Sequence, residues 1–341
     1  MDVAKGQGNP HMWPALVFAA LMLGIGTLVP SAALAQKPLP PEIEAFVDEM
    51  AQKHQFDAET LRRLFSKVPP RPAILRAISA PGTARPWHEF RRLNVDAAHI
   101  NGGTAFWRQH AAVLARASRE YGVPEEIIVA TIGIETLYGR NTGNHRVLDA
   151  LTTLAFQYPP RAELFRAQLE EYLLLARESG FDMMRIRGSY AGAIGIPQFL
   201  PGSYRRYAVD FDGDGKRDLM GTVADAIGSV ANYYKAHGWR AGEQVVVPAH
   251  SGGSDAEALV GMGIKPQLKF AELKRSGVVP AGPVADEEAA ALFVVETETG
   301  PRYWLGLNNF YVITRYNRSV DYALAVYELA RELRALAMPE D

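Results

Sequence analysis

One apolar stretch is the strongest indication of the fold: Ala130-Thr131-Ile132-Gly133-Ile134-Glu135-Thr136-Leu137-Tyr138-Gly139-Arg140. Its spacing of apolar residues is typical of the end of a helix, and Gly139 suits a stop just past the last turn. Glu135 lies seven residues after Ile128 and four after Thr131. Helical spacing therefore puts its carboxylate on or beside the inward face of the helix.

Burying this glutamate is costly, because a carboxylate is almost never fully buried without compensation. Burial disfavours the charged form, and the negative end of the helix dipole acts in the same direction. The expected result is a carboxylic acid that holds a proton near neutral pH, as a general acid requires. A structural salt bridge from Glu135 to Arg140 or Arg146 is the alternative interpretation.

Length and composition indicate a globular protein. The chain has 341 residues, of which 48% are hydrophobic and 22% charged, enough for one large domain or two to three subdomains. The formal net charge of −2 gives no electrostatic case for a nucleic-acid partner. Cysteine is absent, which excludes disulfides, a lipid-anchoring thiol and a Cys-ligated metal.

The first 35 residues are typical of a signal peptide. Lys5 precedes an apolar run over residues 13–29, and Ala33-Leu34-Ala35 fits a cleavage site. The sequence therefore predicts export to the periplasm or beyond the cell. An uncleaved membrane anchor is the alternative, because the run approaches membrane-spanning length.

Periodicity along the rest of the chain favours helices, with a β-like region near residues 240–300 and a loop at residues 85–90. Short β-like runs lie at residues 244–248, 291–297 and 302–307. The expected helices are 41–50, 56–68, 104–121, 147–156, 161–179, 224–238 and 319–336.

A glycine-rich segment at residues 187–201 carries Ser189 and Gln198 among apolar residues. One interpretation is a helix with close packing of small residues. The other is a backbone that approaches a ligand closely, with Ser189 and Gln198 as hydrogen-bond donors.

An acidic turn follows, Asp210-Phe211-Asp212-Gly213-Asp214-Gly215, which matches the start of a calcium loop. The usual glutamate at the twelfth position is replaced by Gly221, and Asp225 could close a widened loop instead. Lys216 would contribute its backbone carbonyl. The alternative is an Asp/Gly turn without an ion.

Taken together, these windows resemble the lytic murein transglycosylase B family over about residues 45–335. The matching residues are Gly133-Ile134-Glu135-Thr136, the 188–201 segment, the 210–215 loop with Asp225, and Asn309-Phe310 with Arg315-Tyr316-Asn317. The resemblance implies a peptidoglycan lytic transglycosylase, a carbon–oxygen lyase that cleaves between N-acetylmuramic acid and N-acetylglucosamine. Glu135 would act alone as acid and then as base, leaving a 1,6-anhydromuramic acid end.

The resemblance also implies roles for other residues. Ser189 and Gln198 would lie in the active site, and Arg161 would contact the muropeptide, although Pro160 replaces a second arginine that is frequent in the family. No cofactor is expected for the chemistry. The implied groove residues are Tyr233, Tyr316, Asn317 and Tyr322, with core packing as the alternative for each tyrosine. The implied ligands of a structural calcium ion are Asp210, Asp212, Asp214, Lys216 and Asp225.

The expected fold class is mainly α (α+β), with a lysozyme-like helical core. Two alternatives to the transglycosylase are a hydrolytic muramidase and a calcium-stabilised, non-catalytic peptidoglycan-binding protein. Peptidoglycan glycan strands are the expected partner, and proteins of cell-wall synthesis or remodelling are further partners that the resemblance allows. The expected domains are a signal peptide at 1–35, an N-terminal helical domain at 36–117 completed by 300–338, a catalytic core at 118–239 with the calcium loop at 210–225, and a small β-containing domain at 240–299.

Overall fold

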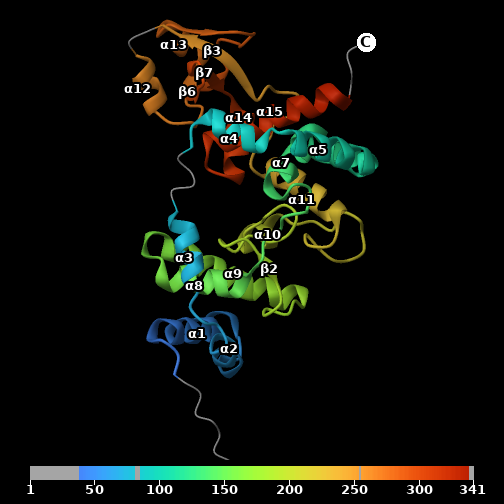
Figure 1. Cartoon of the computed structure of the whole chain (residues 1–341), viewed down its shortest axis with the longest axis vertical. Helices are drawn as coiled ribbons and strands as arrows, with labels where there is room; N and C mark the ends of the chain where they lie inside the picture. Colours follow the sequence, from blue (N-terminus) through green and yellow to red (C-terminus); the bar gives the residue numbers. More distant parts are fainter. Residues whose placement is uncertain (1–37, 81–84, 253–254, 338–341) are drawn as a thin grey trace, which may run out of the picture. The chain divides into compact units, whose positions relative to one another are not determined.

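Helices make up most of the computed structural model, which describes residues 38–80, 85–252 and 255–337 (Figure 1). The expected class, mainly α with a small β part, is confirmed. The predicted signal peptide lies outside the described residues. Within the described residues, no helix combines the length and the apolar character needed to cross a membrane.

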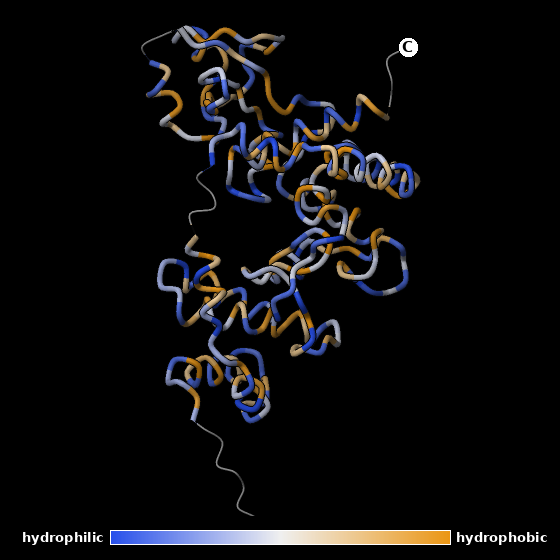
Figure 2. Tube along the Cα trace, viewed as in Figure 1, coloured by the Kyte–Doolittle hydropathy of each residue, from blue (hydrophilic) through white to orange (hydrophobic). Residues whose placement is uncertain are grey.

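The first three helices pack against two helices from the middle of the chain. Phe46 shows why, because its ring meets Phe65 and Phe156 edge-on, with centroids 6.0 and 5.9 Å apart. Along the first three helices, hydrophobic and hydrophilic residues alternate, as expected for helices that bury one face (Figure 2). The helices are α1 (Pro41–His54), α2 (Ala58–Phe65), α3 (Pro72–Ser79), α8 (Val147–Gln157) and α9 (Ala162–Ser179), with a 3-10 turn at Pro159–Arg161.

The next helices surround α7 (Glu125–Thr136), which is almost wholly buried. They are α5 (Ala97–Gln109), α6 (Ala111–Tyr121), α11 (Val223–Ala236) and α15 (Val320–Ala337), and α4 (Trp87–Asn94) packs on α15. Residues of the predicted N-terminal domain, 36–117, thus pack partly on α8 and α9 and partly around α7. The division into domains stays a prediction, and residues 39–341 group as one unit.

Two expectations about these helices were wrong. The segment at residues 85–90 is not a loop, because α4 begins at Trp87, whose side chain is buried while polar neighbours hide the periodicity. The single helix expected at residues 104–121 is two helices. His110 separates them, because its φ of −116° and ψ of 20° lie outside helical values.

Helix α7 ends earlier than its sequence suggests. Pro124 is the N-cap residue, just before the first helical residue Glu125, and the last helical residue is Thr136. Leu137 and Tyr138 then adopt left-handed conformations, with φ of 49° and 62°. The Tyr138 hydroxyl donates to the carbonyl of His99 at 2.6 Å, which holds this turn against α5.

The glycine-rich segment is not a helix, so that interpretation was wrong. A short ribbon pairs β1 (His145–Arg146) with β2 (Arg187–Gly188), and bridges then join Gly188 to Ile194 and Ile194 to Phe199. Helix α10 (Pro201–Tyr207) follows. The segment is therefore a folded loop that leads from the ribbon to α10.

A five-stranded antiparallel sheet has the order β4-β6-β7-β3-β5. The predicted β-like runs lie in β3, β6 and β7. However, β7 begins at Gly300, so the whole strand lies beyond the predicted domain boundary at residue 299, and it pairs with both β3 and β6. The bounds are β3 (Val246–Ser251), β4 (Leu268–Lys269), β5 (Val278–Pro280), β6 (Ala289–Thr297) and β7 (Gly300–Gly306), with α12 (Ala256–Gly261), α13 (Phe270–Arg275) and α14 (Asn308–Tyr316) beside them.

Replacing Gly133 by alanine should destabilise the protein although alanine favours helices. A Cβ at this position would lie 2.5 Å from the Tyr138 hydroxyl oxygen and 2.8 Å from its Cζ. Tyr138 cannot yield easily, because its hydroxyl is bonded to His99. Overpacking costs about 1–3 kcal/mol against a helix-propensity gain of about 1 kcal/mol. Urea denaturation should show a lower free energy of unfolding.

Gly261→Ala is the matched control, because Gly261 also lies in a helix and a Cβ there meets no atom within 4 Å. Its free energy of unfolding should stay equal or rise slightly. Equal stability of the two variants would contradict the close packing of Tyr138 against α7.

Candidate active site

Glu135 lies in the last turn of α7, where its side chain is half-buried. Its Oε1 accepts a hydrogen bond of 2.6 Å from the Tyr322 hydroxyl of α15. Burial raises the pKa of Glu135 to about 7, and the bond from Tyr322 opposes this rise. The carboxyl group therefore holds a proton for a large fraction of the time at neutral pH.

The salt-bridge interpretation of Glu135 is wrong. Arg146 instead donates to Asp149 at 2.6 Å, and Arg140 is exposed. Within the described part of the chain, no Lys, Arg or His forms an ion pair with Glu135. The carboxyl group is thus left without a positive partner that would keep it ionised.

The residue after the glutamate joins two loops. Thr136 Oγ1 donates to the carbonyl of Ile196 at 2.8 Å and accepts from the Gly139 N–H at 2.9 Å. One buried hydroxyl therefore ties the left-handed turn after α7 to the glycine-rich loop. This contact fixes the position of Glu135 relative to residues 188–199.

A group of aromatic rings packs next to Glu135. The rings of Tyr316 and Tyr322 are stacked, with centroids 6.4 Å apart, and Tyr316 also meets Tyr233 at 4.9 Å. The Tyr316 hydroxyl donates to the carbonyl of Pro197 at 2.6 Å. Burial raises the pKa of both Tyr316 and Tyr322 well above the ordinary value, so their hydroxyls stay protonated.

The glycine-rich loop presents Gln198 and Ser189 as half-buried side chains. Gln198 has a left-handed φ of 50°, and its Nε2 donates to the carbonyls of Thr142 and Gly195 at 3.0 and 2.9 Å. Ser189 Oγ accepts from the Ala193 N–H at 3.0 Å, which leaves its hydroxyl hydrogen to donate elsewhere. The loop therefore offers a hydroxyl donor and an amide oxygen to a bound ligand.

The remaining predicted substrate-binding residues are Tyr233, Asn317 and Arg161. Tyr233 is buried, and its hydroxyl donates to the carbonyl of Arg315 at 2.6 Å, as expected for core packing. Asn317 is exposed at the end of α14. Arg161 is exposed before α9, with its guanidinium 5.5 Å from the ring centroid of Phe165.

Sequence reasoning missed two residues that shape the site. Tyr234 is fully buried and shares a 2.8 Å hydrogen bond with Thr131 of α7. Phe199 lies under Tyr233 and Tyr316, with ring centroids 5.5 and 5.7 Å away. The adjacent tyrosines at 233 and 234 were the available signal, because neighbouring positions of a helix point in different directions: Tyr234 toward Thr131 of α7 and Tyr233 toward Arg315 of α14.

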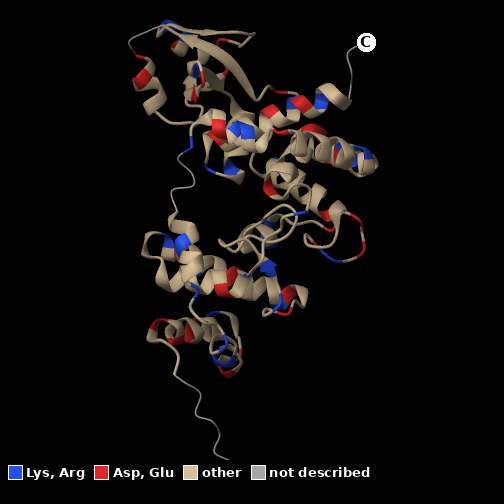
Figure 3. Cartoon of the chain, viewed as in Figure 1, with Lys and Arg blue, Asp and Glu red and all other residues tan. Residues whose placement is uncertain are grey.

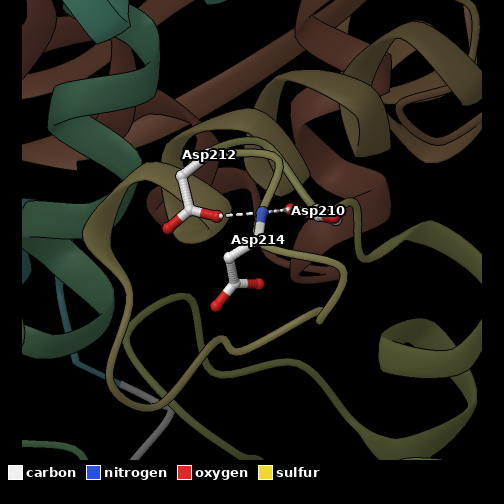
Figure 4. A group of neighbouring side chains, drawn as sticks. All are labelled: Asp210, Asp212 and Asp214. Atoms are coloured by element: carbon white, nitrogen blue, oxygen red, sulfur yellow. Dashed lines mark hydrogen bonds between the residues drawn. The ribbon is translucent and has the colours of Figure 1, made fainter.

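The three aspartates of the acidic turn converge, as Figure 4 shows for Asp210, Asp212 and Asp214. One carboxylate oxygen from each lies within 4.8 Å of the others. Two oxygens on opposite sides of a Ca²⁺ ion are at most about 5 Å apart, so the spacing fits this ion. The backbone N–H of Asp214 donates to both Asp210 and Asp212 at 3.1 Å, which orders the turn.

Asp225 does not join this cluster. It is 1% exposed, and its two oxygens accept from the N–H groups of Phe211 and Asp218 at 2.7 and 2.8 Å. Burial raises its pKa, although these bonds oppose the rise. Its position in α11 makes it a cap for the loop backbone, and the predicted role as a ligand receives no support from this geometry.

Charges of both signs are spread over the helices (Figure 3). The formal net charge of the whole chain is −2. The surroundings of Glu135 thus consist mainly of aromatic rings and loop backbone.

Comparisons with known proteins agree with this geometry. Residues 39–331 match the family model described as the transglycosylase SLT domain. The chain is 44% identical over 301 residues to the membrane-bound lytic murein transglycosylase B of Escherichia coli, covering 85% of this chain and 82% of that protein.

Solved structures show the same similarity. Lytic transglycosylase SltB1 of Pseudomonas aeruginosa has 48% identity and a TM-score of 0.84, covering 88% of this chain and 99% of that one. Slt35 of Escherichia coli, solved in complex with calcium, has 44% identity and a TM-score of 0.80, covering 87% and 93%. SltB3 of Pseudomonas aeruginosa, solved with NAG-NAM-pentapeptide, has 35% identity and a TM-score of 0.75, covering 86% and 79%.

These matches span most of the chain and most of each relative, and the identities far exceed what a shared fold alone requires. The resemblance inferred from the motifs is confirmed, together with the lysozyme-like fold class and the peptidoglycan-cleaving activity. The chain therefore belongs to the transglycosylase SLT-domain family and is a lytic murein transglycosylase.

Proposed function

We propose that Glu135 carries the reaction alone, first as acid and then as base. Its proton passes to the glycosidic oxygen, and the bond from that oxygen to C1 of N-acetylmuramic acid breaks. The carboxylate then takes the proton of the C6 hydroxyl, whose oxygen forms a bond to C1. The products are a free N-acetylglucosamine hydroxyl and a 1,6-anhydromuramic acid end, and no water is consumed.

One observation carries this proposal: burial raises the pKa of Glu135 to about 7, and among the described residues no carboxylate contributes to the shift. An ordinary glycosidase needs two carboxyl groups on either side of the scissile bond. An attacking hydroxyl within the substrate has a high effective concentration and needs no second group to hold a water. The geometry therefore favours the anhydro product over hydrolysis.

The roles of the surrounding residues follow from their hydrogen-bonding groups. Tyr322 orients Glu135 through its hydroxyl, and Tyr316 holds the loop through Pro197. Ser189 and Gln198 would bind the N-acetyl sugar. The substrate's own N-acetyl group can stabilise the cationic intermediate, as in substrate-assisted glycosidases.

Three further residues, Asn317, Arg161 and Tyr233, receive roles from the family resemblance and from their positions. Asn317 and Arg161 are exposed and would contact the glycan and the peptide, as the family resemblance implies. Tyr233 would act by supporting the ring of Tyr316, because its own hydroxyl is already bonded to the backbone.

We further propose that the substrate is the glycan strand of peptidoglycan in the periplasm. The relative SltB3 was solved with NAG-NAM-pentapeptide, and the relative from Escherichia coli is named membrane-bound. Export would follow from residues 1–35, with an uncleaved anchor as the alternative. Proteins of cell-wall synthesis or remodelling remain proposed partners.

We propose a structural Ca²⁺ ion at Asp210, Asp212 and Asp214, with the carbonyl of Lys216 as a further ligand. The convergence of the three carboxylates and the calcium complex of Slt35 support it. The ion would stabilise the loop between α10 and α11 and would take no part in the chemistry.

Glu135→Gln should abolish turnover while the fold and glycan binding persist. Loss of a general acid lowers the rate by about a hundredfold to ten-thousandfold. Purified peptidoglycan is digested and the products are weighed by mass spectrometry. The wild type should release muropeptides lighter by one water than hydrolysed ones. Glu120→Gln on α6, an exposed glutamate, is the control and should digest normally.

Reducing-end products from the wild type would instead support a hydrolytic muramidase. No products from folded wild type would support a binding protein. Activity of Glu135→Gln within tenfold of the wild type would contradict the single-acid mechanism.

The rate should fall as the pH rises through about 7. Only protonated Glu135 can donate to the leaving oxygen, and its pKa is raised to about 7 by burial. Above this pH, kcat/KM should drop by about tenfold per pH unit. The bond from Tyr322 lowers this pKa, so Tyr322→Phe should move the alkaline limb to higher pH. An alkaline limb that moves to lower pH would contradict this assignment.

Removing calcium should lower the melting temperature without altering the products. Ca²⁺ at a hundred times its Kd stabilises a folded protein by about 3 kcal/mol. Asp212→Asn should lose the Ca²⁺-dependent rise in melting temperature. Asp182→Asn is a matched control, because Asp182 also accepts a backbone N–H two residues on, at 2.9 Å from Met184. A wild-type melting temperature that ignores both Ca²⁺ and chelator would rule out the ion.

A further inference from the structure

A pocket of about 360 Å³ lies beside the β1–β2 ribbon, away from Glu135. Arginines from three separate segments meet in it: one before α3, one in β1 and one in β2. The side chains that the argument uses are Arg71, His145, Arg146, Asp149 and Arg187.

The pocket has more positive than negative charge. Asp149 is its only acidic lining residue among those described, and the Asp149 side chain is 3% exposed. Arg71 contacts Asp149 Oδ2 at 2.6 Å, and Arg146 donates to Oδ1 at 2.6 Å. One carboxylate thus faces two guanidinium groups, so it neutralises only one of their two charges.

Arg187 adds a further positive charge. Arg187 donates a 2.6 Å hydrogen bond to the carbonyl of Asn144, which is an uncharged acceptor. Within the described part of the chain no carboxylate pairs with Arg187, and its side chain is exposed. The lining thus carries three arginines against one aspartate. An anionic ligand would complete this set of charges.

The pocket is joined directly to the proposed sugar site. Arg187 in β2 is two residues before Ser189, which corresponds to about 7 Å along a strand. The loop before β1 also contacts the loop after β2, because a Cβ on Gly143 would lie 2.6 Å from the Ser189 nitrogen. A five-residue peptide reaches at most about 17 Å, so a peptide on a sugar near Ser189 can enter the pocket.

Arg161, the arginine that the family resemblance assigns to the muropeptide, does not line this pocket. Arg146 and Asp149 lie at the start of α8, whereas Arg161 follows its end. The eleven residues of α8 separate the two positions by about 16 Å. Pro160 also stands where a second arginine is frequent in the family, so peptide recognition on that side has one positive charge fewer.

We propose that the pocket of Arg71, Arg146 and Arg187 binds a carboxylate of the stem peptide on the glycan strand. The inference rests on the proposed function, because it needs a strand bound near Ser189. Arg187 is the residue that meets the ligand most directly, since its charge is not already engaged by Asp149. The site would make the enzyme prefer strands that carry free peptide carboxylates.

The test compares two substrates: glycan strands with free stem-peptide carboxylates and the same strands with these carboxylates amidated. The ratio of the two kcat/KM values is measured for wild type and for Arg187→Gln. The wild type should prefer the free carboxylates by about fivefold or more, and Arg187→Gln should lose most of this preference. Arg185→Gln is the matched control, because Arg185 is exposed, lies outside the pocket and pairs with Asp182 at 3.2 Å. It should keep the wild-type ratio.

Melting temperatures show whether each variant is folded. If Arg187→Gln does not fold, Arg71→Gln is measured in the same way and should also reduce the ratio. A wild-type ratio near one, or a folded pocket variant that keeps the full preference, would overturn the inference while leaving the proposed function intact. Wild type that releases no anhydro products from either substrate would instead mean that the proposed function has failed, and this inference with it.

Discussion

The hydrogen bond from Tyr322 to Glu135 joins residues 187 positions apart in the chain. It requires α15 to lie against α7, and aromatic rings from α11, α14 and α15 pack together beside this contact. The bond lowers the pKa of Glu135 while burial raises it, and burial wins. A carboxyl group titrating near neutral pH is therefore a property of the assembled helices, not of α7 alone.

The loop opposite the glutamate is held by backbone carbonyls instead of charges. Thr136 and Tyr316 donate to the carbonyls of Ile196 and Pro197, which are adjacent in the chain. Neither bond depends on ionisation, so the loop keeps its place while Glu135 gains and loses a proton. Neutral supports suit a carboxyl group that titrates near neutral pH, because a charged neighbour would shift its pKa.

The two charged features of the chain lie at the ends of this loop system. The β1–β2 ribbon with its arginines precedes residues 188–199, and the aspartate turn follows α10. Asp225 supports the aspartate turn, because its buried carboxylate accepts the backbone N–H groups of Phe211 and Asp218. Charged side chains thus fix loop backbone in this part of the chain.

The sequence by itself determined the helical class, the inward position of Glu135, the acidic turn and the family, because each depends on local spacing or on a contiguous motif. It misjudged α4, the break at His110 and the conformation of residues 188–199, where polar residues or glycines hide the period. Only the tertiary structure decided that Tyr322 reaches Glu135, that Tyr233 is a buried support and that Arg71 and Arg187 share a pocket. These contacts join segments far apart in sequence, and no local pattern encodes which side chains the packing of helices brings together.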